Sequence, residues 1–133
     1  MKKIIAMLLV AVFAIGASSK VMAQEAEQMR VYAELLGTKT NVLGLNKNVK
    51  VTVDMGQFQS SYKAYTLQDE DGKDIKFNSM VAAMNYMGQR GWKFVQTYII
   101  GDAKSGYVYH WLLYKDVNNA EEIMEGLKVK GMD

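Results

Sequence analysis

A single histidine and the absence of cysteine limit the chemistry that this chain can perform. His110 is the only histidine among the 133 residues. These counts exclude a thiol nucleophile, a cysteine-ligated metal and a site built from several histidines. A histidine base also needs a nucleophile and an orienting acid, and no serine lies in a Gly-x-Ser-x-Gly turn. We therefore predict that the protein is not an enzyme and has no catalytic residues.

The acidic run at 69–74 is the best candidate for a calcium site. Calcium needs several oxygen ligands that converge from fixed spacings. Lys73 interrupts the run, and no glutamate follows at the distance that an EF-hand loop requires. The pattern therefore favours a solvated turn over a metal site.

The methionines at 80, 84 and 87 are the remaining candidate ligands, because clustered thioethers can bind copper(I). No histidine lies near them in the sequence, and methionine readily fills irregular gaps in a hydrophobic core. Core packing is the favoured interpretation. We therefore expect no metal site and no cofactor.

Aromatic residues form the strongest candidate for a functional surface. The segments 92–100 and 107–115 have the composition of two strands joined by a short loop. A symmetric hairpin would pair Ile100 with Tyr107, and it would place His110 opposite Thr97. An odd shift of the register would redistribute the side chains between the two faces. In the symmetric register, one face carries the candidate interaction or ligand-binding residues Trp92, Phe94, Tyr98, Tyr107, Tyr109 and Trp111.

Three roles remain open for this aromatic face. It could be core that packs against a helix, since large apolar faces are usually buried. It could contact another protein, because tyrosine and tryptophan bury area and keep a polar group. It could also stack on a small ligand such as a sugar or a peptide. The decision depends on which face of the sheet the helix covers, and the sequence does not determine that.

The elements around the hairpin predict a small α+β domain. Residues 78–90 predict the main helix, with Asn78 as its N-cap and an apolar stripe on one face. Gly91 stands where a left-handed residue ends a helix, and Gly88 could bring the last turn close to the sheet. A short C-terminal helix is expected after the capping-box pair Asn119 and Glu122. Strand candidates cover 29–36, 48–54, 62–67, 73–77, 92–100 and 107–115.

The alternation of valines makes 48–54 the clearest strand, and Asp71-Gly72 is a good turn for a hairpin of 62–67 with 73–77. The segment 29–36 could be a strand or a helix, because alanine, glutamate and leucine favour helices. The expected fold is α+β, with a small mostly antiparallel sheet of about four or five strands packed on one main helix, plus the short C-terminal helix.

The stretch 84–95, MNYMGQRGWKFV, resembles a motif of the small bacterial domain-of-unknown-function family numbered forty-one seventy-seven. That motif joins a helix to a strand through Gly-x-x-Gly-Trp, and the resemblance extends over about 62–115. Lys93 departs from the acidic residue that usually follows the tryptophan. The resemblance implies a small α+β domain and no assigned activity. Exported chains of this kind are similar to proteins of Bacteroidetes.

The N-terminus has the pattern of a bacterial signal peptide. Lys2 and Lys3 precede a short apolar run at 4–17, and a small-x-small site ends at Ala23. We expect a mature single domain at 24–133, with no membrane span, in the periplasm or outside the cell. Removing the three lysines of residues 1–23 from the formal net charge of +2 leaves about −1, so nucleic acid is not an expected partner.

These observations predict an exported, non-enzymatic interaction module. Its partner is an unknown protein or a second copy of the chain in a homodimer. The alternative function is binding of a small ligand, a sugar or a peptide, through the aromatic residues of the sheet.

Overall fold

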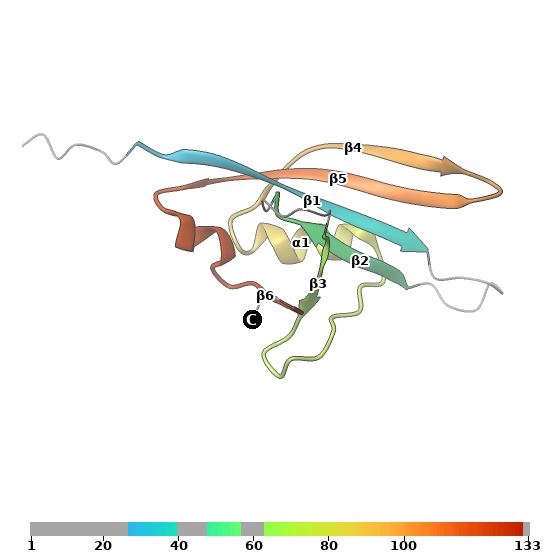
Figure 1. The fold of residues 1–133 in the computed structure, drawn as a ribbon, viewed down its shortest axis with the longest axis horizontal. Coiled ribbons are helices and arrows are strands. Elements are labelled where there is room, and N and C mark those ends of the chain that lie inside the picture. The colour runs from blue at the N-terminus through green and yellow to red at the C-terminus, as the bar shows by residue number, and fades with distance from the viewer. Residues whose placement is uncertain (1–26, 40–47, 57–62, 132–133) are drawn as a thin grey trace, which may run out of the picture.

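The computed structural model describes residues 27–39, 48–56 and 63–131, so the predicted signal peptide at 1–23 lies outside the described residues. Six strands form one antiparallel sheet in the order β4-β5-β1-β2-β3-β6 (Figure 1). Among these residues, no helix has the length and apolar character needed to cross a membrane. The strands are β1 (Met29–Lys39), β2 (Val49–Asp54), β3 (Tyr65–Gln68), β4 (Lys93–Asp102), β5 (Gly106–Val117) and β6 (Lys128–Val129).

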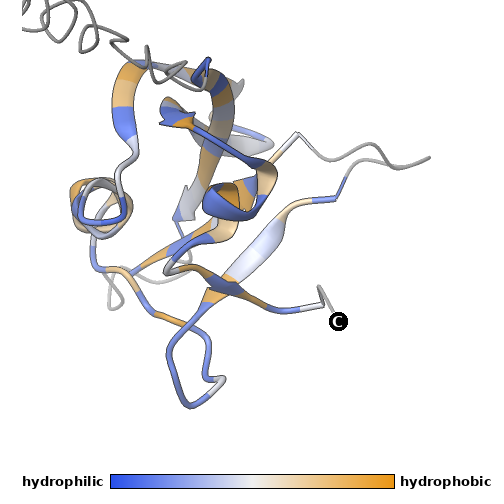
Figure 2. Cartoon of the chain, turned by 90° about the vertical axis from the view of Figure 1, so that its left-hand side faces the viewer, coloured by the Kyte–Doolittle hydropathy of each residue, from blue (hydrophilic) through white to orange (hydrophobic). Residues whose placement is uncertain are grey.

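The first segment, 29–36, is a strand and not a helix. It belongs to β1, which pairs with β5 on one side and with β2 on the other. Ala33 and Leu35 are buried, whereas Tyr32 is exposed and the other residues of the opposite face are exposed or only partly buried. Hydrophobic and hydrophilic residues alternate along several strands in Figure 2. Ladder pairing on both edges, together with one buried face, outweighs the helical propensity of this segment.

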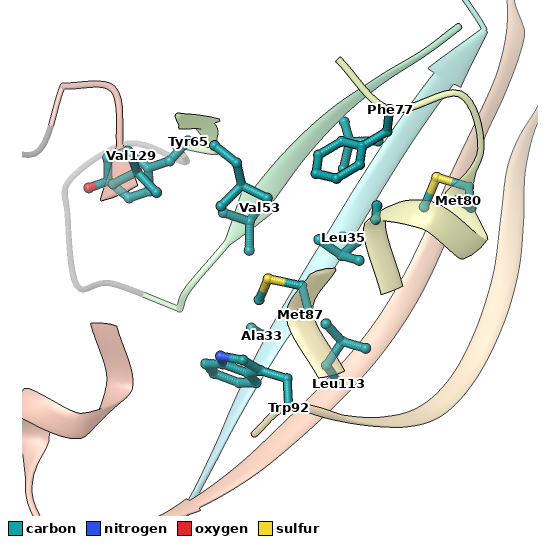
Figure 3. Close-up of a cluster of buried hydrophobic side chains, with 13 residues drawn as sticks. Ala33, Leu35, Val53, Tyr65, Phe77, Met80, Met87, Trp92, Leu113 and Val129 are labelled. Atoms are coloured by element: carbon teal, nitrogen blue, oxygen red, sulfur yellow. The ribbon is translucent and has the colours of Figure 1, made fainter. Parts of the chain in front are cut away.

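The single α-helix of the described residues, α1 (Met80–Gly88), covers one face of the sheet, which we call the core face. Ser79 caps the helix, because its hydroxyl oxygen accepts a hydrogen bond from the Ala82 N–H at 3.1 Å. The predicted cap, Asn78, is therefore displaced by one residue. Figure 3 shows Met87 of α1 in the same buried cluster as Leu35 and Leu113 of the sheet.

The prediction of an α+β fold with one main helix and a C-terminal helix is wrong. The fold is mostly antiparallel sheet, and α1 spans 9 residues instead of the expected 78–90. The C-terminal element is only a 3₁₀ turn, η1 (Ala120–Met124). Gly126, at a φ of 71°, turns the chain back after η1. The following residues then pair with β3 as the sixth strand, which the sequence did not reveal.

The predicted hairpin of 62–67 with 73–77 is only partly formed. Among its described residues, β3 is the only regular strand, and the returning chain makes isolated bridges at Asp74 and Phe77. Phe77 bridges to Val49 of β2 and leads directly into α1. The return segment therefore leads into the helix that packs on the core, and it does not add a regular strand to the sheet.

Two glycines near the end of α1 differ in their roles. Gly91 has a φ of 88°, as its predicted role requires. Gly88 is exposed, and a Cβ at that position would meet no atom within 4 Å. The expectation that Gly88 permits a close approach to the sheet is therefore wrong.

We predict that Met87→Ala lowers the free energy of unfolding by about 2–5 kcal/mol, because it removes a fully buried side chain between helix and sheet. Val81→Ala, on the exposed side of α1, is the matched control, with an expected change of within about 0.5 kcal/mol. Urea denaturation followed by circular dichroism measures both. Equal losses in the two variants would contradict this description of the core.

Candidate interaction surface

The β4–β5 hairpin differs from the predicted one by one position over most of its length. Tyr107 lies opposite Gly101 and not opposite Ile100. The cause is the tight turn after Asp102, whose Oδ1 accepts hydrogen bonds from Ser105 N–H at 2.7 Å and from Lys104 N–H at 2.8 Å. The Ser105 hydroxyl donates to the same oxygen at 2.8 Å. These bonds hold the pKa of the Asp102 carboxyl below its usual range.

A β-bulge at Val95 restores the predicted register at the other end of β4. Phe94 lies opposite Leu113, as expected, but Gln96 lies opposite Leu112. The one extra residue reverses the facing of every side chain beyond it. Tyr98 consequently points to the face opposite α1, which we call the outer face.

The six aromatic residues predicted to share one face are therefore divided. Trp92 precedes β4 and is buried in the core, with an exposed fraction of 2%. The pairing register places Phe94, Tyr107, Tyr109 and Trp111 on the core face and Tyr98 on the outer face. The prediction that these six residues share one face is wrong, because the turn shifts the register at Tyr98 by one residue and the bulge separates Tyr98 from Phe94.

The core face of the hairpin is only partly covered. Tyr109 and Trp111 pack against the buried cluster. The Phe94 ring meets the Trp111 ring edge to face, with centroids 5.3 Å apart. Phe94 and Tyr107 nevertheless remain about half exposed. Burial against the core therefore decreases towards β4 and towards the turn.

On the outer face, Glu34, Tyr98 and His110 form a cluster that the sequence did not predict. Tyr98 donates its hydroxyl hydrogen to Glu34 Oε2 at 2.7 Å. His110 Nδ1 lies 2.5 Å from Glu34 Oε1. The Tyr98 and His110 rings are stacked, with centroids 4.6 Å apart. His110 lies opposite Tyr98, so the predicted pairing of His110 with Thr97 is wrong. Its ring is held by neighbours from two other strands.

This cluster connects the three strands of the β4–β5–β1 half of the sheet. One carboxylate oxygen of Glu34 bonds to Tyr98 of β4, and the other bonds to His110 of β5. The carboxylate therefore links β1 to both strands of the hairpin. Among the described residues, no group of three or more histidine, aspartate or glutamate side chains could hold a metal ion. Knowledge of the strand order would have revealed the cluster, because Glu34 lies on the polar side of the alternation in β1.

The outer face continues towards the far end of β5 with a second polar group. The Arg30 guanidinium makes two hydrogen bonds to Asp116, at 2.7 and 3.0 Å, and lies 4.2 Å from the centre of the Tyr114 ring. The Arg30 hydrogen bond holds the pKa of the Asp116 carboxyl below its usual range. Lys93 of β4 approaches the same ring, at 5.7 Å. This end of the outer face is therefore charged and partly exposed.

The most unusual feature is β4 itself. It is the terminal strand of the sheet, and all 10 of its residues are exposed. Ile99 and Ile100 are the most exposed apolar residues of the strand, at 58% and 56%. Phe94, Val95 and Tyr98 are also exposed. Proteins usually protect long apolar edges, because the free backbone groups of such an edge can pair with another chain.

No protein-family model matches the sequence, and the comparisons with curated proteins and with solved structures return no match. The function must therefore be inferred from the geometry of the described residues and from the sequence.

We predict an energetic coupling of about 0.5–3 kcal/mol between Glu34 and His110, because each holds the other in a partly buried site. The measurement is a double-mutant cycle of Glu34→Ala and His110→Ala, read as the free energy of unfolding in urea. The control cycle pairs His110→Ala with Val81→Ala, whose effects should add to within about 0.5 kcal/mol. Additive effects in the first cycle would show that the cluster does not stabilise the sheet.

Proposed function

We propose that this chain is an exported, non-enzymatic interaction module that binds a protein through the open edge of β4. The observation that carries the proposal is that every residue of β4 is exposed at the end of the sheet, with apolar side chains on both faces. Large exposed apolar patches are uncommon in isolated soluble domains and often mark contact sites.

Strand addition is the binding mode that fits this edge. A partner strand would satisfy the outward-pointing backbone groups of β4, and its side chains would cover the apolar residues on the two faces. Ile99 and Ile100, on opposite faces of the strand, would both lose solvent contact on binding. The Glu34–His110–Tyr98 cluster supports this mode. Its hydrogen bonds link the hairpin to β1 and so hold the edge of β4 in a fixed position.

Export of the module is inferred from the sequence. The basic and apolar pattern of residues 1–23 supports secretion to the periplasm or beyond. The resemblance to the domain-of-unknown-function family also remains a prediction. The joint that carries it has a glycine at a φ of 88°, then the buried Trp92, and then β4. This motif would therefore anchor the start of the exposed strand in the core.

The test is site-specific photo-crosslinking in cells that export the chain. A photoreactive amino acid replaces Ile99 in one variant and Val81 in the control variant. The two positions are almost equally exposed, at 58% and 57%, but Val81 lies on α1, away from the β4 edge. We expect a crosslinked protein at Ile99 and none at Val81.

Crosslinking at neither position, or equally at both, would contradict the proposal.

A second candidate function, binding of a sugar or a peptide, is favoured by one observation. Tyr107 and Tyr109 line a shallow open pocket together with Thr38, Lys39 and Ser105. Lys39 Nζ lies 5.9 Å from the centre of the Tyr109 ring. Tyrosine rings beside hydroxyl and ammonium groups can stack on a ligand and also hydrogen-bond to it.

This candidate predicts that glycans or short peptides shift the amide resonances of Tyr107 and Tyr109. Tyr107→Ala should abolish the shifts, because it removes one wall of the pocket. Tyr32→Ala, an equally exposed tyrosine on the outer face, is the control and should leave them unchanged. Absence of any shift across a broad panel would exclude the pocket as a ligand site.

A further inference from the structure

We propose that the partner of β4 is a second copy of this chain. Two β4 strands would pair antiparallel around a two-fold axis through Tyr98 and join the two sheets edge to edge. This inference rests on the proposed function, since it names the partner of the same edge. It is carried by the symmetry of the strand, by its charges and by the side chains that would meet.

Symmetry restricts how two identical edge strands can pair. A two-fold axis perpendicular to the sheet leaves each side chain on its own face, so the central residue must lie opposite itself. Val95 is the extra residue of the bulge, so β4 offers nine pairing positions from Lys93 to Asp102. The middle position is Tyr98. This centre alone pairs the strand over its full length.

The charges at the ends of β4 fit the same centre. Lys93 and Asp102 are the only charged residues of the strand, and both lie on the outer face. With Tyr98 at the axis, Lys93 of each copy comes opposite Asp102 of the other. All three turn hydrogen bonds of Asp102 go to Oδ1, so Oδ2 can accept a hydrogen bond from the lysine ammonium.

The side chains between these charges are compatible with such pairing. On the core face, Thr97 would lie opposite Ile99 of the second copy. On the outer face, Gln96 would lie opposite Ile100 of the second copy. Threonine and isoleucine are β-branched residues that pack well across strands. Each isoleucine, now more than half exposed, would gain a neighbour on the other chain.

The same features disfavour other partners and other registers. A shift along the edge leaves an ammonium and a carboxylate without opposite charges, and it reduces the number of paired positions. The bulge at Val95 interrupts a regular ladder with an unrelated strand, whereas the two-fold axis places one bulge near each end of the paired strands. The edge is therefore matched to one antiparallel register with itself.

The experiment uses single cysteines, because the natural chain has none. Residues directly opposite each other in an antiparallel pair have Cα atoms about 4.5–5.5 Å apart, which fits the range of about 4.4–6.8 Å for disulfides. Tyr98→Cys should therefore form a covalent dimer under mild oxidation of residues 24–133. Gln96→Cys alone is the control, because its two copies would lie about 13 Å apart along the strands.

A mixture of Gln96→Cys and Ile100→Cys keeps Tyr98 and its hydrogen bond intact. These two positions lie opposite each other across the axis, so the mixture should crosslink whereas neither variant crosslinks with itself. Light scattering of the unmodified protein should show a concentration-dependent rise towards twice the monomer mass. Ile99→Lys should lower that association at least tenfold, because two ammonium groups would enter the new contact.

Three results would overturn the inference. The first is a monomer at all concentrations, and the second is a dimer that Tyr98→Cys does not crosslink. The third is crosslinking of Gln96→Cys with itself as readily as with Ile100→Cys. If the unmodified protein is monomeric but the Ile99 photo-crosslink captures a different protein, the second copy is excluded and the interaction module stands. If that position captures nothing, both proposals fail.

Discussion

The structure depends on the contact between one short helix and one face of the sheet. Met87 of α1 and Trp92, which follows it across the Gly91 turn, are both fully buried against β1 and β5. A helix of 9 residues is about 13 Å long, which is too short to cover strands of 10–12 residues. The hairpin of β4 and β5 therefore extends past α1, and the exposure of its turn end results from this mismatch in length, because η1 packs near the other end of β5.

Local patterns in the sequence were sufficient for most individual elements. The alternating valines of β2, the Gly91 stop and the two long strands of the hairpin are governed by residues next to them in the chain, and these predictions are confirmed. The C-terminal helix was placed correctly after Asn119 but is a 3₁₀ turn. β6 was missed, because its partner is a strand about 60 residues earlier. Strand pairing at that distance leaves no periodic signal in the sequence.

The candidate surface was predictable in composition but not in arrangement. The hydrogen bonds of Asp102 set the length of the turn, and the bulge at Val95 reverses the facing of Tyr98. Each changes the register by one residue, which no composition pattern reports. The partner of His110 was hidden for a different reason: Glu34 is 76 positions away, and only the placement of β1 beside β5 brings the two together.

The central position of β1 has a consequence for how the chain folds. This strand follows the predicted signal peptide, yet its longest ladder is with β5, and its Arg30–Asp116 contact spans 86 positions. Such non-local pairing makes folding slow compared with folding dominated by local contacts. The sheet cannot close until nearly all of the chain is available. During synthesis, β1 therefore gains its partner β2 early and its partner β5 only when nearly the whole chain has been made.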